Sequence, residues 1–191
     1  MGAAGSTGTA GSAGSAEANR FTVTGAVAHP VRLTVAELRT SWPQHTADVV
    51  FDCATSGPRK HRFAGPLLRE VVTAAGPAFD PRRRKDRSRF LLEITGGDGH
   101  GTVLSWAEVD EDFGNAPVLL ATSLDGRELD IAGAQLVVPW DRCGARYISG
   151  ITRVWLGTCP GRWPVTPSPT PPPTPPPPAP TTPPPTPPRS T

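Results

Sequence analysis

The sequence predicts an α+β domain built on a mixed, mostly antiparallel sheet with short inserted helices. Three observations support this fold class. Apolar runs of strand length outnumber runs with helical spacing, most of these runs are short, and the candidate helices lie between candidate hairpins. The regular alternation of strand and helix that is typical of a doubly wound nucleotide fold is not seen.

Composition divides the 191 residues into three parts. Residues 1–19 are mostly Gly, Ala, Ser and Thr, and residues 160–191 hold 17 of the 25 prolines. Neither end can bury enough apolar area to offset the entropy lost on ordering, so we expect a disordered leader and a disordered Pro-rich tail. Residues 20–159 remain for one compact domain of ordinary size.

The segment up to Pro43 predicts one strand and one helix. In RFTVTG, Phe21 and Val23 alternate with polar residues, which is the period of a half-buried strand. Thr34 stands three residues before Glu37, the spacing of a capping box. A short helix should therefore begin after Thr34 and end before Pro43.

Two further strands and a second helix are expected before Gly76. The runs TADVVFDC and RKHRFAG predict neighbouring strands joined by a turn at Gly57 and Pro58. Pro66 suits the first turn of the next helix, because the missing N–H has no partner there. The apolar residues of LLREVVTAAG share one side of that helix, and Gly76 occupies the usual place for a residue of positive φ after its last turn.

The second half of the domain predicts hairpins separated by one helical turn. RFLLEITGGDGHGTVLS has the pattern of two strands around a Gly-rich turn. Ser105 and Glu108 repeat the capping-box spacing. A buried strand in APVLLATSL leads to a turn at Asp125 and Gly126, and AQLVVPW and ARYISGITRVWL supply the last two strands.

The charge of the chain argues against nucleic-acid binding. The net charge is +2 and residues 20–159 are nearly balanced, so the broad basic field that phosphate backbones require is absent. We interpret the basic run at 82–89 as a solvated loop before a strand, with docking of an anionic partner or a cofactor phosphate as the alternative. The acidic run at 108–112 could balance it.

The sequence shows neither a membrane-spanning segment nor a secretory signal. No apolar run reaches the length of about 20 residues that a membrane-spanning helix needs, and no secretory signal is visible at the start. The three cysteines, Cys53, Cys143 and Cys159, match no zinc-binding spacing. A cytoplasmic setting is the default expectation, and export replaces it if the true start lies upstream.

Familiar catalytic motifs do not account for the chain. G-x-G-x-x-G, the Walker loop, paired zinc-binding histidines and G-x-S-x-G are all absent. The feature that remains is Cys53, which ends the apolar run VVFDC. Judged by residue type alone, a lone cysteine is more often a small buried side chain than a metal ligand.

The order of segments nevertheless resembles the molybdopterin-binding domain of the sulfite-oxidase family of oxidoreductases, in a short single-domain form. The resemblance runs from Phe21 to Leu156 and rests on seven stretches in the same order: FTVTGAV, LTVAELRTSWP, VVFDC, FAGPLLREVVTAAG, GGDGHGTVLS, PVLLATSLDGREL and LVVPWDRCGARYISGITRVWL. It implies the fold of that family and oxygen-atom or electron transfer, on a small-molecule substrate, at a cysteine-ligated molybdenum.

The resemblance also implies site residues. Cys53 falls where the cysteine of the family binds molybdenum, and a thiolate is the soft ligand that this metal needs besides the pterin dithiolene. The loop CGARYISGITRV is implied to lie near the pterin, so Gly144 and Arg146 become candidates for binding the molybdenum–molybdopterin cofactor. His100 stands where the family usually has the tyrosine of a DGY motif, and we count it as a third cofactor-binding candidate.

Departures from the family leave a second hypothesis open. A Gly/Ala/Ser leader stands where the family has a segment rich in Arg and His, and Ile148, Ser149 and Gly150 follow GAR where a basic residue and a Trp are common. Whether the chain is an enzyme therefore stays open at this point. The alternative is a cofactor-free binding module on the same scaffold, with the Pro-rich tail as a spacer or as a ligand for a PxxP-recognising protein.

Overall fold

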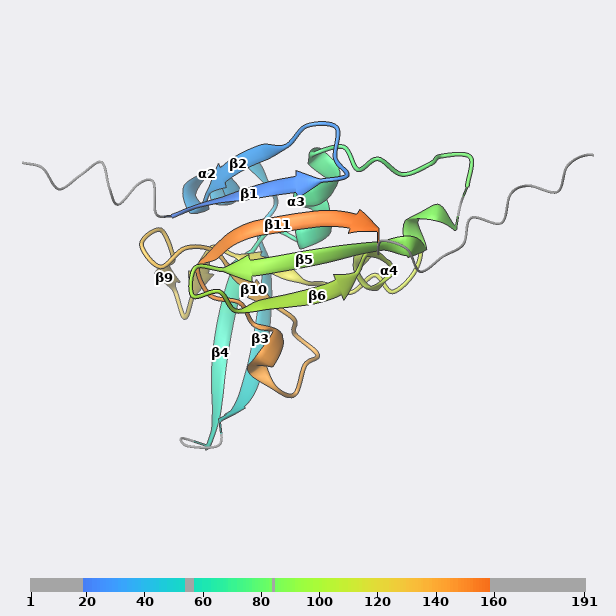
Figure 1. The fold of residues 1–191 in the computed structure, drawn as a ribbon. Coiled ribbons are helices and arrows are strands. Elements are labelled where there is room, and N and C mark those ends of the chain that lie inside the picture. The colour runs from blue at the N-terminus through green and yellow to red at the C-terminus, as the bar shows by residue number, and fades with distance from the viewer. Residues whose placement is uncertain (1–18, 54–56, 84, 159–191) are drawn as a thin grey trace, which may run out of the picture. The chain divides into compact units, whose positions relative to one another are not determined.

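The computed structural model describes residues 19–53, 57–83 and 85–158, with the side chains of 51–53 and 57 outside the description. These residues form a domain dominated by sheets, with few short helices (Figure 1). The predicted α+β class with a mixed, mostly antiparallel sheet is therefore confirmed. The leader up to residue 18 and the Pro-rich tail lie outside the described residues. No described helix is long and apolar enough to span a bilayer.

Five strands form the main sheet, in the order β2-β1-β11-β5-β6. Their bounds are β1 (Arg20–Gly25), β2 (Val31–Thr34), β5 (Phe90–Gly96), β6 (Gly101–Ser105) and β11 (Ile151–Thr158). β1 pairs with β11 in parallel, and the other neighbours pair antiparallel. The first and last described strands therefore lie side by side. β2 was not predicted, because four residues are too few to show an alternating pattern.

A second sheet has the order β3-β4-β8-β9. Its strands are β3 (His45–Cys53), β4 (Gly57–Gly65), β8 (Ser123–Leu124) and β9 (Arg127–Glu128). β8 pairs with β4 at Phe63 and Ala64, and in the described residues the far parts of β3 and β4 pair as strands with each other. The N–H of Asp125, just after β8, also donates to the oxygen of Arg62. We call residues 48–53 and 57–62 the two-stranded arm, and Figure 1 shows it extending away from the main sheet.

The turn predicted at Gly57 and Pro58 was wrong. Both residues belong to β4, where they pair with Cys53 and Asp52. Proline fits there because the first positions of a strand tolerate a missing N–H. A further small sheet joins β7 (Leu119–Ala121) to β10 (Gln135–Val137).

Helices form at the three places that the sequence predicted, although Pro66 precedes the N-cap residue Leu67 and lies outside the first turn of its helix. The two 3₁₀ turns were not predicted, and residues 145–150, which the sequence assigned to the last strand, lie outside it. The helices are α2 (Val35–Ser41), α3 (Leu68–Ala74), α4 (Trp106–Val109) and the 3₁₀ turns η1 (Asp86–Arg89) and η2 (Gly144–Arg146). Capping boxes are present at Thr34 and Ser105. Gly76 has a φ of +69°, and the turn after β8 has positive φ at both Asp125 and Gly126. The capping boxes, the place of Gly76 and this turn were predicted from the sequence.

The core lies between the main sheet and the elements that cover it. Val23 of β1, Val71 and Val72 of α3, and Leu92 of β5 are fully buried, as is Leu156 of β11. Each such side chain contributes about 1.5–3 kcal/mol through burial. The apolar side of α3 is therefore the side that the sequence pattern assigned to the core.

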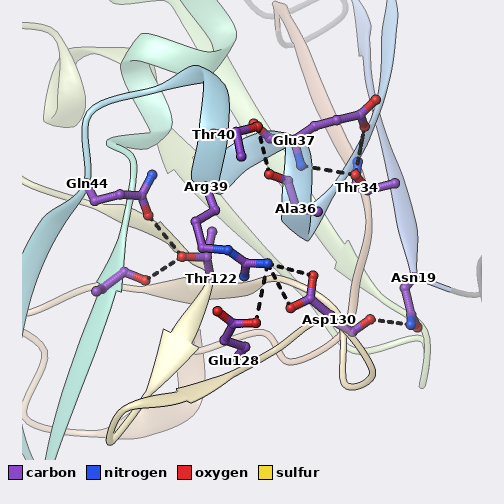
Figure 2. Close-up of polar contacts among 11 residues, drawn as sticks. Asn19, Thr34, Ala36, Glu37, Arg39, Thr40, Gln44, Thr122, Glu128 and Asp130 are labelled. Atoms are coloured by element: carbon purple, nitrogen blue, oxygen red, sulfur yellow. Dashed lines mark hydrogen bonds and ion pairs between the residues drawn. The ribbon is translucent and has the colours of Figure 1, made fainter.

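A polar network attaches α2 to the segment that follows β9 (Figure 2). Arg39 donates to both carboxylate oxygens of Asp130, at 3.2 and 3.0 Å, and lies 3.4 Å from the carboxylate of Glu128. Beside it, the hydroxyl of Thr122 donates to Gln44 at 2.9 Å. These contacts join the start of the domain to residues 78 to 91 positions later in the chain.

Ion pairs join the basic run to the acidic run. Arg87 donates to Asp110 at 2.9 Å and also pairs with Asp112. Asp110 is 3% exposed and accepts the indole N–H of Trp106 at 2.6 Å. A buried carboxylate is tolerated when its lone pairs are filled by donors, and here an arginine and an indole fill them. Asp110 thus fixes η1 against α4.

Substitution of Asp110 by Ala should lower the free energy of unfolding by about 2 kcal/mol, because the indole N–H and one side of Arg87 lose a charged acceptor in a buried setting. Urea denaturation followed by far-UV circular dichroism measures this. Asp48→Ala is the matched control, since Asp48 pairs with Arg62 where both side chains are 68% exposed. Equal midpoints for the two variants would contradict the role given to Asp110.

Tyr147 is expected to make the domain less stable as the pH rises above about 10. Its hydroxyl donates to the backbone oxygen of Val138 at 2.8 Å, and burial, followed by the charge of Asp141, raises the pKa of Tyr147 to about 12. An unfolded tyrosine has a pKa of about 10, so the unfolded state loses its proton first as pH rises. The stabilisation should be complete below about pH 10 and decline between about pH 10 and 12.

The difference in urea midpoint between the parent chain and Tyr147→Phe, measured from pH 8 to pH 12, isolates this group from lysines and other residues. We expect the parent to lose its advantage over the variant across the upper part of this range. A difference that stays constant with pH would show that Tyr147 ionises equally in the folded and unfolded states.

Candidate functional site

Two loops bring three of the four candidate residues together. The turn between β5 and β6 carries His100, and the loop between β10 and β11 carries Gly144 and Arg146 in η2. His100 Nε2 lies 3.0 Å from the backbone oxygen of Ala145, to which it donates when that nitrogen holds the proton. A backbone bond of 2.9 Å from Gly97 to Gly150 joins the same two loops. We call residues 97–100 and 144–150 the joined loops.

The joined loops are held by close backbone packing. The N–H of Gly96 donates to the oxygen of His100 at 2.8 Å, and Asp98 accepts the N–H of His100 at 2.9 Å. On the other side, a Cβ on Gly133 would lie 3.0 Å from the Cα of Gly150, and both glycines have positive φ. Side chains at these two positions would force the loop outward, so glycine is needed for this approach.

Arg146 is held by two carboxylates. Its Nε and Nη2 donate to the two oxygens of Asp141 at 2.7 and 2.6 Å, a bidentate pair, and its Nη1 donates to Glu108 at 3.3 Å. The hydrogen bonds to Asp141, and then those to Glu108, raise the pKa of Arg146 above its ordinary value, so the guanidinium stays charged. A guanidinium has five N–H groups, and the contacts to described residues use three. Two N–H groups remain for another acceptor.

The fourth candidate, Cys53, belongs to a different element. It is the last residue of β3, at the end of the two-stranded arm, and its backbone pairs with Gly57. Its side chain lies outside the described residues. Cys143, which precedes η2, is a free and exposed thiol. Within the described ranges, no three His, Cys, Asp or Glu side chains gather as a metal site.

Sequence reasoning missed the two carboxylates that hold Arg146. Glu108 was assigned only to the capping box, and its Oε2 does accept the N–H of Ser105 at 2.7 Å, while its Oε1 accepts from Arg146. The 38 residues between Glu108 and Arg146 leave no local pattern that could reveal this pair. Asp141, five residues before Arg146, lies close enough in the sequence to have been proposed as its partner.

The hydrogen-bonding groups of the joined loops are of the types that bind a cofactor with a phosphate and a polar ring. Arg146 has two N–H groups free for an acceptor, and the exposed imidazole of His100 can donate or accept. An arginine that is already held in place by carboxylates loses little side-chain freedom when it binds a further oxygen. The residues present therefore fit the organic part of a molybdopterin.

Comparisons with known proteins bear on the fold and the family of the chain. The structure is similar to the sulfane dehydrogenase SoxCD from Paracoccus pantotrophus, with a TM-score of 0.55 and 21% sequence identity over 72% of this chain and 37% of that one. This likeness shows the sulfite-oxidase-type fold, and the matched part spans well under half of that chain. No curated protein matches the sequence. The family model described as oxidoreductase molybdopterin binding domain matches residues 11–160, which include every described residue. The chain therefore belongs to the oxidoreductase molybdopterin-binding domain family.

Proposed function

We propose that the chain is a molybdopterin-dependent oxidoreductase that transfers oxygen atoms or electrons to or from a small molecule, with the Cys53 thiolate as the protein ligand of molybdenum. The observation that carries the proposal is the family match, which includes both the strand that ends at Cys53 and the loop that holds Arg146. The bound cofactor would supply the redox chemistry, and the protein would supply position and charge.

Each candidate residue has a defined task in this proposal. Cys53 provides a soft, anionic ligand of the type that molybdenum prefers. Arg146 donates its two remaining N–H groups to an anionic oxygen of the cofactor. The imidazole of His100 binds a polar edge of the pterin, and Gly144, which has no side chain, lets the cofactor approach the backbone of η2.

The full chain, produced in a molybdenum-replete host, should contain about one molybdenum atom per chain, and the Cys53→Ser variant should lose it, because a hydroxyl is a far weaker ligand for this metal than a thiolate. Elemental analysis of the purified proteins measures this. Cys143→Ser is the matched control, since Cys143 is an exposed free thiol outside the proposed ligand set, and this variant should keep the metal.

Unmutated protein that folds but contains neither molybdenum nor pterin would end this proposal. Such a result would favour the second hypothesis, a cofactor-free binding module on the same scaffold. The ultraviolet–visible spectrum gives an independent reading, because a bound molybdopterin absorbs in the near-ultraviolet and visible ranges, whereas the apoprotein does not.

Substitution of Arg146 by Ala should lower the pterin content of the purified protein by about tenfold, the effect of removing charged hydrogen bonds to the cofactor. Release and fluorescence of the oxidised pterin measures the content. Arg153→Ala is the matched control, because Arg153 pairs with Glu93 on the main sheet and is not a candidate cofactor-binding residue. A folded Arg146→Ala variant with unchanged pterin content would remove Arg146 from the site.

A further inference from the structure

A cavity of about 620 Å³ lies between α3, the segment that follows it and α4. It shares no residue with the joined loops or with the end of β3. Its volume is in the range of small-molecule sites, and it combines an aromatic wall with charged side chains. The proposed oxidoreductase activity makes no use of it.

The aromatic wall of the cavity is held in a fixed geometry. Phe79 lies with its ring centroid 5.0 Å from that of Trp106 and 4.8 Å from that of Phe90. The indole N–H of Trp106 is already donated to Asp110. The wall therefore presents apolar ring surface, and the indole has no free donor to offer a ligand.

The two arginines that line the cavity already bind other side chains of the protein. Arg87 is held by the carboxylates of Asp110 and Asp112, and its guanidinium lies 5.6 Å from the ring centroid of Phe113. Arg69 donates through Nη1 to the side-chain oxygen of Asn115. Both arginines therefore already have acceptors within the protein, which offset part of the positive charge at the cavity.

The negative charge that lines the cavity is not engaged in the same way. Glu70 Oε2 is buried without a hydrogen-bond donor in the described part of the chain, and Glu70 Oε1 lies 3.6 Å from His45 Nε2, too far for a good hydrogen bond. Glu111 has no ion-pair partner among the residues that the structure describes. Within the described ranges, the Glu70 carboxylate therefore has one loose contact, to His45, and keeps acceptor capacity that a ligand with an N–H could use.

We propose that this cavity binds a small organic amine. The protonated amino group donates to Glu70, and the apolar body lies against Phe79 and Trp106. An ammonium group is a donor only, which matches a carboxylate whose one described contact, to His45, is long, and the face of an aromatic ring attracts a cation. Glu111 adds a second negative charge at the same cavity.

Isothermal titration calorimetry of the full chain with benzylamine, benzyl alcohol and benzoate tests the proposal, since the three probes share a ring and differ in charge. We expect one benzylamine to bind per chain, benzyl alcohol to bind about tenfold more weakly and benzoate not to bind, because a charged hydrogen bond is worth roughly this factor. Equal binding of the three, or preference for benzoate, would overturn the proposal.

Two variants and a control locate the site. Glu70→Gln should weaken benzylamine binding by about tenfold, because it removes the charge and keeps the shape. Ala74→Phe places a ring in the cavity from the exposed last residue of α3 and should abolish binding without changing any charge. Glu93→Gln, on the main sheet, should bind as the parent does.

If Glu70→Gln fails to fold, the Ala74→Phe variant still tests whether benzylamine binds in this cavity. Benzylamine binding that survives in folded Ala74→Phe protein would place the amine elsewhere and overturn the proposal. Binding that is lost in this variant and retained in Glu93→Gln supports it. Both outcomes are independent of molybdenum content, so they leave the proposed oxidoreductase function untouched.

Discussion

The parallel pairing of β1 with β11 is the contact on which the rest of the domain depends. Residues 22–25 pair with 153–156 in the centre of the main sheet, and Val23 and Val154 face each other there with no exposed surface. Parallel neighbours need a crossover connection, and here the connection contains nearly all the remaining residues of the domain. A Cβ on Gly25 would lie 2.0 Å from the oxygen of Leu156, so the end of this pairing requires a glycine.

The position of the joined loops follows from that pairing. β11 also pairs with β5, and its first residue, Ile151, lies opposite Gly96, where β5 ends. The register shifts between Ile151 and Arg153, so the chain enters β11 through a bulge beside the turn that carries His100. A bulge re-aims the chain at the end of a strand, and here it directs the loop of η2 onto that turn. The candidate site is therefore a consequence of strand register at the centre of the fold.

The sequence predicted what is decided locally and missed what is decided by long-range packing. The capping pair Thr34 and Glu37 and the turn at Asp125 and Gly126 depend on neighbours a few residues away, so their patterns were sufficient. β2 is too short to show a period, and its place at the edge of the sheet comes from β1. The turn at Gly57 and Pro58 was placed too late because Gly-Pro is a strong turn signal, whereas strand pairing continues through both residues.

The candidate site was also predictable only in part. His100 and η2 were selected from a family resemblance, and the structure shows that the two loops are in contact. Nothing near Arg146 in the sequence indicates Glu108, because that pair forms only after α4 and η2 have packed together. Cys53 remains a sequence prediction, since its backbone ends β3 and its side chain lies outside the described residues.

The charges of the two sites imply different modes of recognition. At the joined loops, Arg146 with Asp141 and Glu108 sums to one negative charge, so no long-range field from this group draws an anionic cofactor toward it. Binding there must depend on the direction of the two remaining N–H groups of the guanidinium. At the cavity beside α3, the aspartates engage Arg87, and Glu70 has, among described residues, only the 3.6 Å contact to His45. One arrangement offers donors to an acceptor, and the other offers an acceptor to a donor, so the same ligand cannot satisfy both.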